Sequence, residues 1–143
     1  MKQPNLWSLK RKAINAMLDA AKAKGVINGV AGLSILKDND EFKQIVWRQI
    51  GNIDRDPRAG ETMQQATNYL VGGLAKYGQS VRTLMDSGTQ VGEPKRGENN
   101  LRGCRIRKIG KYTVWAFFSG HPDQNEDNAI ADVAVNLFEK ALT

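Results

Sequence analysis

The only histidine of the chain stands where a ligand could bind. His121 follows a segment that indicates a β-strand and precedes the start of the last helix. Connections at strand ends lie at the surface and often carry binding residues. A lone histidine can ligate haem iron or shuttle a proton. The alternative is an ordinary loop residue, because one histidine without a partner is a weakly specific signal.

The start of the last helix could bind an anion. The backbone amides of Gln124, Asn125 and Glu126 would point out of the helix N-terminus, where they can bind a carboxylate or phosphate. The alternative is that Asp123 caps the helix and satisfies these amides itself. Glu126, three residues after Asp123, completes a pattern typical of a capping box.

Two arginines extend this candidate site. Arg102 and Arg105 begin a strand that would pair with the strand ending at Ser119, in a hairpin that turns at Gly110. Their guanidinium groups could then pair with ligand carboxylates. The predicted ligand-binding residues are Ser119, Gly120, His121, Gln124, Arg102 and Arg105, with His121 as the metal ligand if the ligand is haem. No Ser/His/Asp or Cys/His arrangement is visible, so we favour a protein without a catalytic centre.

The charge of the chain suggests a different partner. Twenty-one Lys and Arg residues against fifteen Asp and Glu give a net charge of +6, and residues 95–111 hold a dense basic stretch. Such a stretch could contact phosphates and bind nucleic acid. Alternatively, it is a solvated strand edge whose charge discourages aggregation.

Composition favours an ordinary globular protein. The 143 residues are 41% hydrophobic and 25% charged, which predicts one domain over residues 1–143. The longest uncharged, apolar-leaning runs have 11 residues, too short for a transmembrane helix. The first residues lack the apolar region of a secretory signal. The single cysteine, Cys104, excludes an internal disulfide, so we expect a cytoplasmic protein.

The periodicity predicts helices alternating with hairpins. Ser8 could cap a first helix that stops at Gly25, and Asp123 could cap the last. The predicted elements are a hairpin over 29–36 and 42–50, a helix over 61–76 that Gly72-Gly73 weakens, a short helix over 79–85, and a hairpin over 102–109 and 112–118. The irregular stretch 87–103 is long enough to be a functional loop. We therefore predict an α+β fold, an antiparallel sheet of four to five strands with helices packed on its faces.

Apolar residues occupy both faces of the predicted strands. Three large aromatic residues would lie on the faces opposite Val46, Val114 and Phe118, namely Trp47, Trp115 and Phe117. Either helices cover both faces, or one face meets a second subunit, because large exposed apolar patches mark contact sites. We expect a homo-oligomer.

The order of these elements resembles the GlcG/HbpS-like haem-binding family. The first helix ends in a Lys-x-x-Gly-like stop, and a strand over Val114–Phe118 runs into Ser119-Gly120-His121. The acidic helix start over Asp123–Asp127 and an alanine-rich helix follow. The likeness covers most of the chain as a pattern and is specific over its last third.

The resemblance implies a layered α/β/α-like domain that forms dimers or larger oligomers. It also implies an accessory protein that binds a small molecule, with haem or a related tetrapyrrole as the candidate, and has no demonstrated catalytic centre. The alternative function is that of a basic, nucleic-acid-associated protein that uses residues 95–111.

Overall fold

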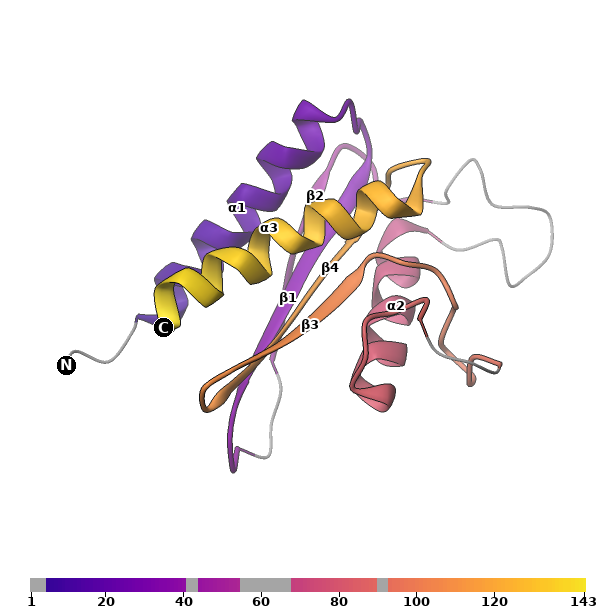
Figure 1. The fold of residues 1–143 in the computed structure, drawn as a ribbon. Helices are drawn as coiled ribbons and strands as arrows, with labels where there is room; N and C mark the ends of the chain where they lie inside the picture. The colour runs from indigo at the N-terminus through magenta and orange to yellow at the C-terminus, as the bar shows by residue number, and fades with distance from the viewer. Residues whose placement is uncertain (1–4, 41–43, 55–67, 90–92) are drawn as a thin grey trace.

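A four-stranded antiparallel sheet forms the centre of the computed structural model (Figure 1), which describes residues 5–40, 44–54, 68–89 and 93–143. The strands are β1 (Gly29–Lys37), β2 (Ile45–Ile50), β3 (Cys104–Ile109) and β4 (Tyr112–Ser119), in the spatial order β2-β1-β4-β3. The helices are α1 (Leu6–Ala23), α2 (Tyr69–Thr83) and α3 (Gln124–Leu142). The predicted α+β fold is confirmed, with four strands.

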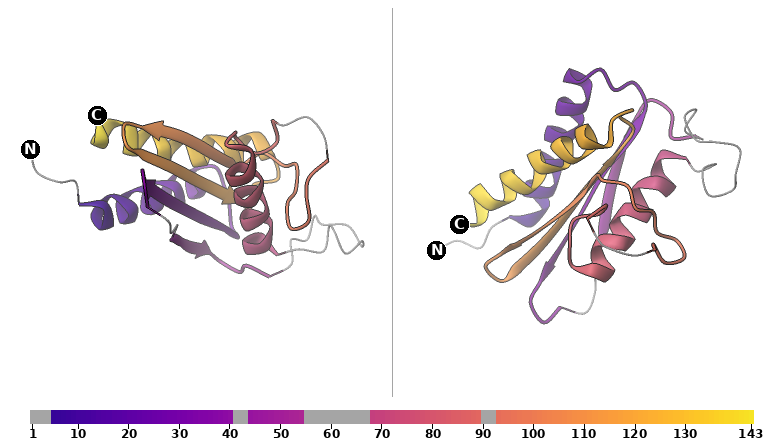
Figure 2. Two further views of the ribbon diagram at one scale, coloured as in Figure 1. Left: turned by 90° about the horizontal axis from the view of Figure 1, so that it is seen from below. Right: turned by 45° about the vertical axis from the view of Figure 1, so that its right-hand side comes forward.

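The helices lie in two layers. Figure 2 shows α1 and α3 together on one face of the sheet and α2 on the opposite face. The two central strands, β1 and β4, are therefore buried along most of their length. Their side chains alternate between an α1/α3 side that includes Leu33, Val114 and Phe118 and an α2 side that includes Val30 and Phe117.

The α2 layer covers part of the apolar face that we expected a second subunit to cover. Trp115 is 1% exposed and Phe117 is fully buried, and both rings contact Tyr77 of α2. Trp47 on strand β2 keeps 43% of its surface exposed. Of these three aromatic residues, only Trp47 remains an argument for self-association.

Helix α2 is continuous across the two glycines that we expected to weaken it. It runs from Tyr69 to Thr83, so the separate short helix predicted over 79–85 is wrong. The glycine at position 73 serves the packing of α2 against the sheet, because a Cβ atom there would lie 2.7 Å from the Phe117 ring. Gly73 costs helix propensity but lets α2 approach the sheet closely. The earlier part of the predicted helix, over 61–67, lies outside the described residues.

The first helix begins earlier than predicted. The side chain of Asn5 caps α1 by accepting a hydrogen bond from the Ser8 backbone N–H at 3.1 Å. The prediction of Ser8 as the cap is therefore wrong, although its amide takes part. The predicted stop is confirmed, since Gly25 has a φ of +81° just after the helix end. In the parts of the chain that the structure describes, no helix is both long and apolar enough to cross a bilayer.

Candidate functional site

The structure places Ser119 at the end of β4, and Gly120 and His121 in the turn between β4 and α3. Ser119 is 8% exposed. Gly120 packs against the entry to β1, because a Cβ atom there would lie 2.5 Å from the carbonyl oxygen of Asn28. The close approach that this glycine permits is thus to the protein's own backbone.

His121 is held at both its backbone and its ring. Its backbone N–H donates to a carboxylate oxygen of Asp127 at 3.0 Å, and its Nδ1 accepts from the Asp123 backbone N–H at 2.9 Å. A neutral imidazole that accepts at Nδ1 carries its hydrogen on Nε2. Nε2 then presents a donor, and ligating iron there would require the ring to give up the bond from Asp123.

The first turn of α3 is satisfied mainly by Asp123. Its side chain accepts from the Asn125 backbone N–H at 2.9 Å, and its carbonyl oxygen accepts from the backbone N–H of Glu126 at 2.9 Å. The predicted capping box does not form, since the Glu126 carboxylate lies 2.5 Å from Nζ of Lys24. Lys24 follows the end of α1. The Asp123 backbone N–H, which Glu126 would accept in a capping box, donates to Nδ1 of His121 instead.

Arg102 reaches the helix start, as its strand position suggested. Its backbone N–H donates to the Gln124 side chain at 2.7 Å, and its guanidinium donates to the Asn125 side chain at 2.6 Å. The Arg105 side chain, from strand β3, pairs with Asp132 of α3 at 2.7 Å and with Asp86 at 3.0 Å. The structure thus joins five of the six predicted residues and places Arg105 apart, in ion pairs of its own.

The rest of the basic strand is occupied in the same way. Arg107 donates to the side chains of Asn136 and Glu139 on α3, and Lys108 pairs with Asp38. These contacts fix β3 to α3 and to the end of β1. They give no support to the nucleic-acid alternative.

A buried ion pair that the sequence did not predict supports the turn. Nζ of Lys76 lies 2.9 Å from the Asp127 carboxylate and 3.0 Å from the Phe118 carbonyl oxygen. The two side chains are 3% and 5% exposed. Helical spacing puts Lys76 on the same face of α2 as Tyr69 and Gly73. A lysine is ordinarily exposed, so the residue type gave no signal of its burial. The pair connects α2, the end of β4 and the start of α3.

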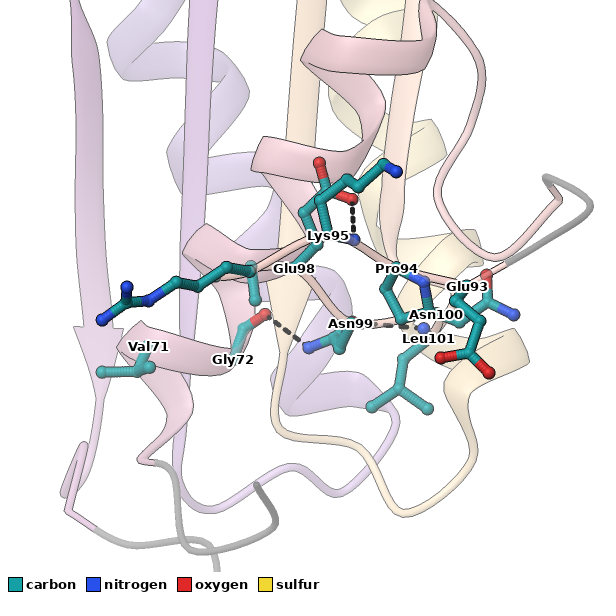
Figure 3. A pocket seen from close by; sticks show the side chains of 12 residues that line it. Val71, Gly72, Glu93, Pro94, Lys95, Glu98, Asn99, Asn100 and Leu101 are labelled. Carbon is teal, nitrogen blue, oxygen red and sulfur yellow. Dashed lines mark hydrogen bonds between the residues drawn. The ribbon is translucent and has the colours of Figure 1, made fainter. Parts of the chain in front are cut away.

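The structure also contains a pocket away from this turn. It measures about 650 Å³ and lies between α2 and the loop over residues 93–101 (Figure 3). Val71, Gly72 and Ala75 line it from the helix, and Pro94, Lys95 and Leu101 line it from the loop. The length of the irregular stretch 87–103 was the signal that could have located it.

Neither thiol nor metal chemistry is evident in the described residues. Burial raises the pKa of the Cys104 thiol to about 12, so the thiol stays protonated and is a poor nucleophile at neutral pH. Within the described ranges, no three His, Cys, Asp or Glu side chains are grouped so that they could hold a metal ion.

Solved structures share this fold. The chain matches no family model and no curated protein sequence. It superposes on HbpS with a TM-score of 0.56 and 14% identity, over 96% of this chain and 91% of HbpS. A double mutant of Streptomyces reticuli HbpS gives 0.57 and 15% identity, over 96% of this chain and 88% of that one.

A third solved structure agrees with these two. Protein ORFY of Klebsiella pneumoniae, described as DUF336, gives a TM-score of 0.54 and 13% identity, over 95% of this chain and 90% of that one. Identities this low establish shared architecture. The predicted resemblance is therefore confirmed at the level of the fold, and the chain has the fold of the HbpS and DUF336 proteins.

Proposed function

We propose that this chain is an accessory protein that binds a small organic molecule, with haem or a related tetrapyrrole as the candidate ligand. The pocket between α2 and residues 93–101 carries the proposal, because its volume of about 650 Å³ lies within the range of small-molecule sites. The fold shared with HbpS and the sequence resemblance to the haem-binding family favour a tetrapyrrole. A fold alone does not specify a ligand, so the site has to be tested directly.

Two places could hold the ligand. One is the pocket, and the other is the turn formed by Ser119, Gly120, His121 and Gln124 together with Arg102. In the turn, Arg102 bonds to the side chains of Gln124 and Asn125, and His121 bonds to Asp123 and Asp127. A ligand there would have to replace such contacts, as His121 would when ligating iron. Arg105 could contact a ligand in the turn only after breaking its ion pairs with Asp86 and Asp132.

Titration with haemin tests the function and its dependence on iron ligation. We expect a saturable shift of the Soret band for the wild-type protein. If His121 ligates the iron, His121→Ala changes the position of the Soret band of the bound haem. Arg102→Ala then weakens haem binding but leaves the position of that band unchanged. Metal-free protoporphyrin IX, followed by its fluorescence, reports binding that needs no iron. Failure of both tetrapyrroles to bind the wild-type protein would overturn the tetrapyrrole proposal.

We also propose that the chain forms homo-oligomers in the cytoplasm. Trp47, with 43% of its surface exposed on strand β2 at one end of the sheet, supports self-association. The cytoplasmic location is supported by the single, buried cysteine. Light scattering should give a multiple of the 15.8 kDa chain mass, and Trp47→Glu should shift it toward the monomer. A monomer mass for the wild-type protein at micromolar concentration would contradict the proposal.

A further inference from the structure

The helix side of the pocket is an apolar surface. Val71, Gly72 and Ala75 lie within the first two turns of α2 and form this wall. Val71 is 47% exposed, and Leu101 on the opposite wall is 46% exposed. A ligand with an apolar body would cover both side chains and remove that surface from water.

The loop side of the pocket is held in place by hydrogen bonds. Glu98 accepts two bonds from Arg82 of α2, at 2.7 and 2.9 Å, and one from the Lys95 backbone N–H at 2.9 Å. The Asn99 side chain donates to the Gly72 carbonyl oxygen at 3.3 Å, as Figure 3 shows.

A buried glutamine of α2 also bonds to this loop and to the segment after α2. Gln79 is fully buried, donates to the Asn100 side chain at 3.1 Å and accepts from the Gly88 backbone N–H at 2.8 Å. Because these contacts fix the loop wall to α2, the pocket is formed before any ligand arrives, which reduces the entropy lost on binding.

The charges around the pocket favour an anion. The Glu98 side chain is 7% exposed, and Arg82 balances its charge. Among the described residues of the lining, the other charged side chains are Glu93, Lys95 and Arg96, all exposed. These three leave an excess of one positive charge at the rim. An acidic group placed there gains favourable electrostatic energy, above all beside a guanidinium.

We propose that the pocket binds an amphipathic organic anion. Its apolar body lies against Val71 and Leu101, and its carboxylate or sulfonate group pairs with Lys95 or Arg96. This inference deepens the proposed small-molecule function and rests on it. If the ligand is a tetrapyrrole, its binding to the pocket should depend on its carboxylate groups and not on its iron.

The test uses two probes with the same apolar body. The first is 1-anilinonaphthalene-8-sulfonate, and the second is the uncharged N-phenyl-1-naphthylamine. We expect Lys95→Ala/Arg96→Ala to weaken binding of the sulfonate about tenfold, the loss that about 1.4 kcal/mol of binding energy corresponds to. Binding of the uncharged probe should not change. Val71→Asp should weaken binding of both probes.

A matched control separates the rim from general charge effects. Arg11→Ala/Lys12→Ala removes two exposed cations from α1, and we expect it to leave the affinity for the sulfonate unchanged. Circular dichroism of each variant identifies any that fail to fold. The rim variant is Lys95→Ala/Arg96→Ala. The inference would be overturned if the control and rim variants lost the same affinity for the sulfonate, or if the wild-type protein showed no saturable binding of it.

The tetrapyrroles distinguish this inference from the proposed function. If protoporphyrin IX binds and Lys95→Ala/Arg96→Ala weakens its binding, both stand. If it binds with the same affinity to the rim variant, the proposed function stands and the pocket inference is wrong. If neither tetrapyrrole binds but the sulfonate binds and depends on the rim, the pocket inference stands and its ligand is another organic anion.

Discussion

Nζ of Lys76 lies 2.9 Å from a carboxylate oxygen of Asp127, and both side chains are almost completely buried. The pair joins helices that lie on opposite faces of the sheet. The other carboxylate oxygen of Asp127 accepts the backbone N–H of His121. The ion pair therefore fixes the turn that the sequence marked as a candidate ligand site.

Breaking this pair from one side should be strongly destabilising. Lys76→Met leaves the Asp127 carboxylate buried without its cation, and we expect a loss of about 3–5 kcal/mol in the free energy of unfolding. Lys76→Met/Asp127→Asn removes both charges and keeps an acceptor for His121, so it should recover a large part of that loss. Urea unfolding of the single and double variants measures this, and a loss below about 1 kcal/mol for the single variant would contradict the expectation.

The glycines around Phe117 should tolerate no side chain. A Cβ atom on Gly32 would lie 2.2 Å from the Phe117 ring, and one on Gly73 would lie 2.7 Å from it. Because that ring is fully buried, we expect Gly73→Ala to cost about 1–3 kcal/mol in stability by overpacking. Phe117→Leu, introduced together with Gly73→Ala, should recover part of the loss.

Gly78 provides the control for this experiment. It lies in the same helix, but a Cβ atom added there would have its nearest neighbours 4.0 Å away. Gly78→Ala should therefore stabilise the protein by about 0.5–1 kcal/mol, the ordinary gain of alanine over glycine in a helix. Thermal unfolding of the two alanine variants should show shifts of opposite sign.

The Cys104 thiol should make the protein less stable at alkaline pH. Burial raises its pKa from 9.0 to about 12 in the folded chain. Between these values the unfolded chain loses the thiol proton while the folded chain retains it, so unfolding becomes easier as the pH rises. Cys104→Ala should show a smaller loss of stability between pH 9 and pH 11. A thiol reagent at pH 8 should modify the wild-type protein only after denaturation, and rapid modification of the native protein would argue against this burial.

Removing the Asn5 cap of α1 should destabilise the protein more than removing the Ser8 side chain. Its side chain accepts the Ser8 backbone N–H, so Asn5→Ala should cost about 1 kcal/mol in the free energy of unfolding. Ser8→Ala leaves that backbone N–H in place and should cost much less. Denaturant unfolding compares the two variants, and the reverse order would restore Ser8 as the cap.

Sequence patterns located elements better than they located contacts. Alternating and helical periodicity predicted both hairpins, α1 and α3, because those patterns arise from burial within one element. The continuity of α2 was not predictable, because it depends on Phe117, which is more than forty residues from Gly73 in the sequence. Long-range packing of this kind overrides local helix propensity.

The same limit applies to the candidate site. The hairpin geometry placed Arg102 beside Gln124, as the structure has it. The aspartates beside Arg105 come from α3 and from the segment after α2, so their proximity depends on how separate elements pack together. The involvement of Lys76 has the same origin, because a lysine is expected in a core only once its partner is known.

The unequal cores on the two faces of the sheet imply that the protein opens in stages. Among the residues that the structure describes, eighteen buried hydrophobic residues form the cluster beneath α1 and α3, against six beneath α2. The smaller cluster has less apolar surface to oppose local unfolding. Backbone amides of α2 should therefore exchange their hydrogens before those of α3. A molecule seated between α2 and residues 93–101 would slow that exchange, so hydrogen exchange would record occupancy of the pocket without any colour change in the ligand.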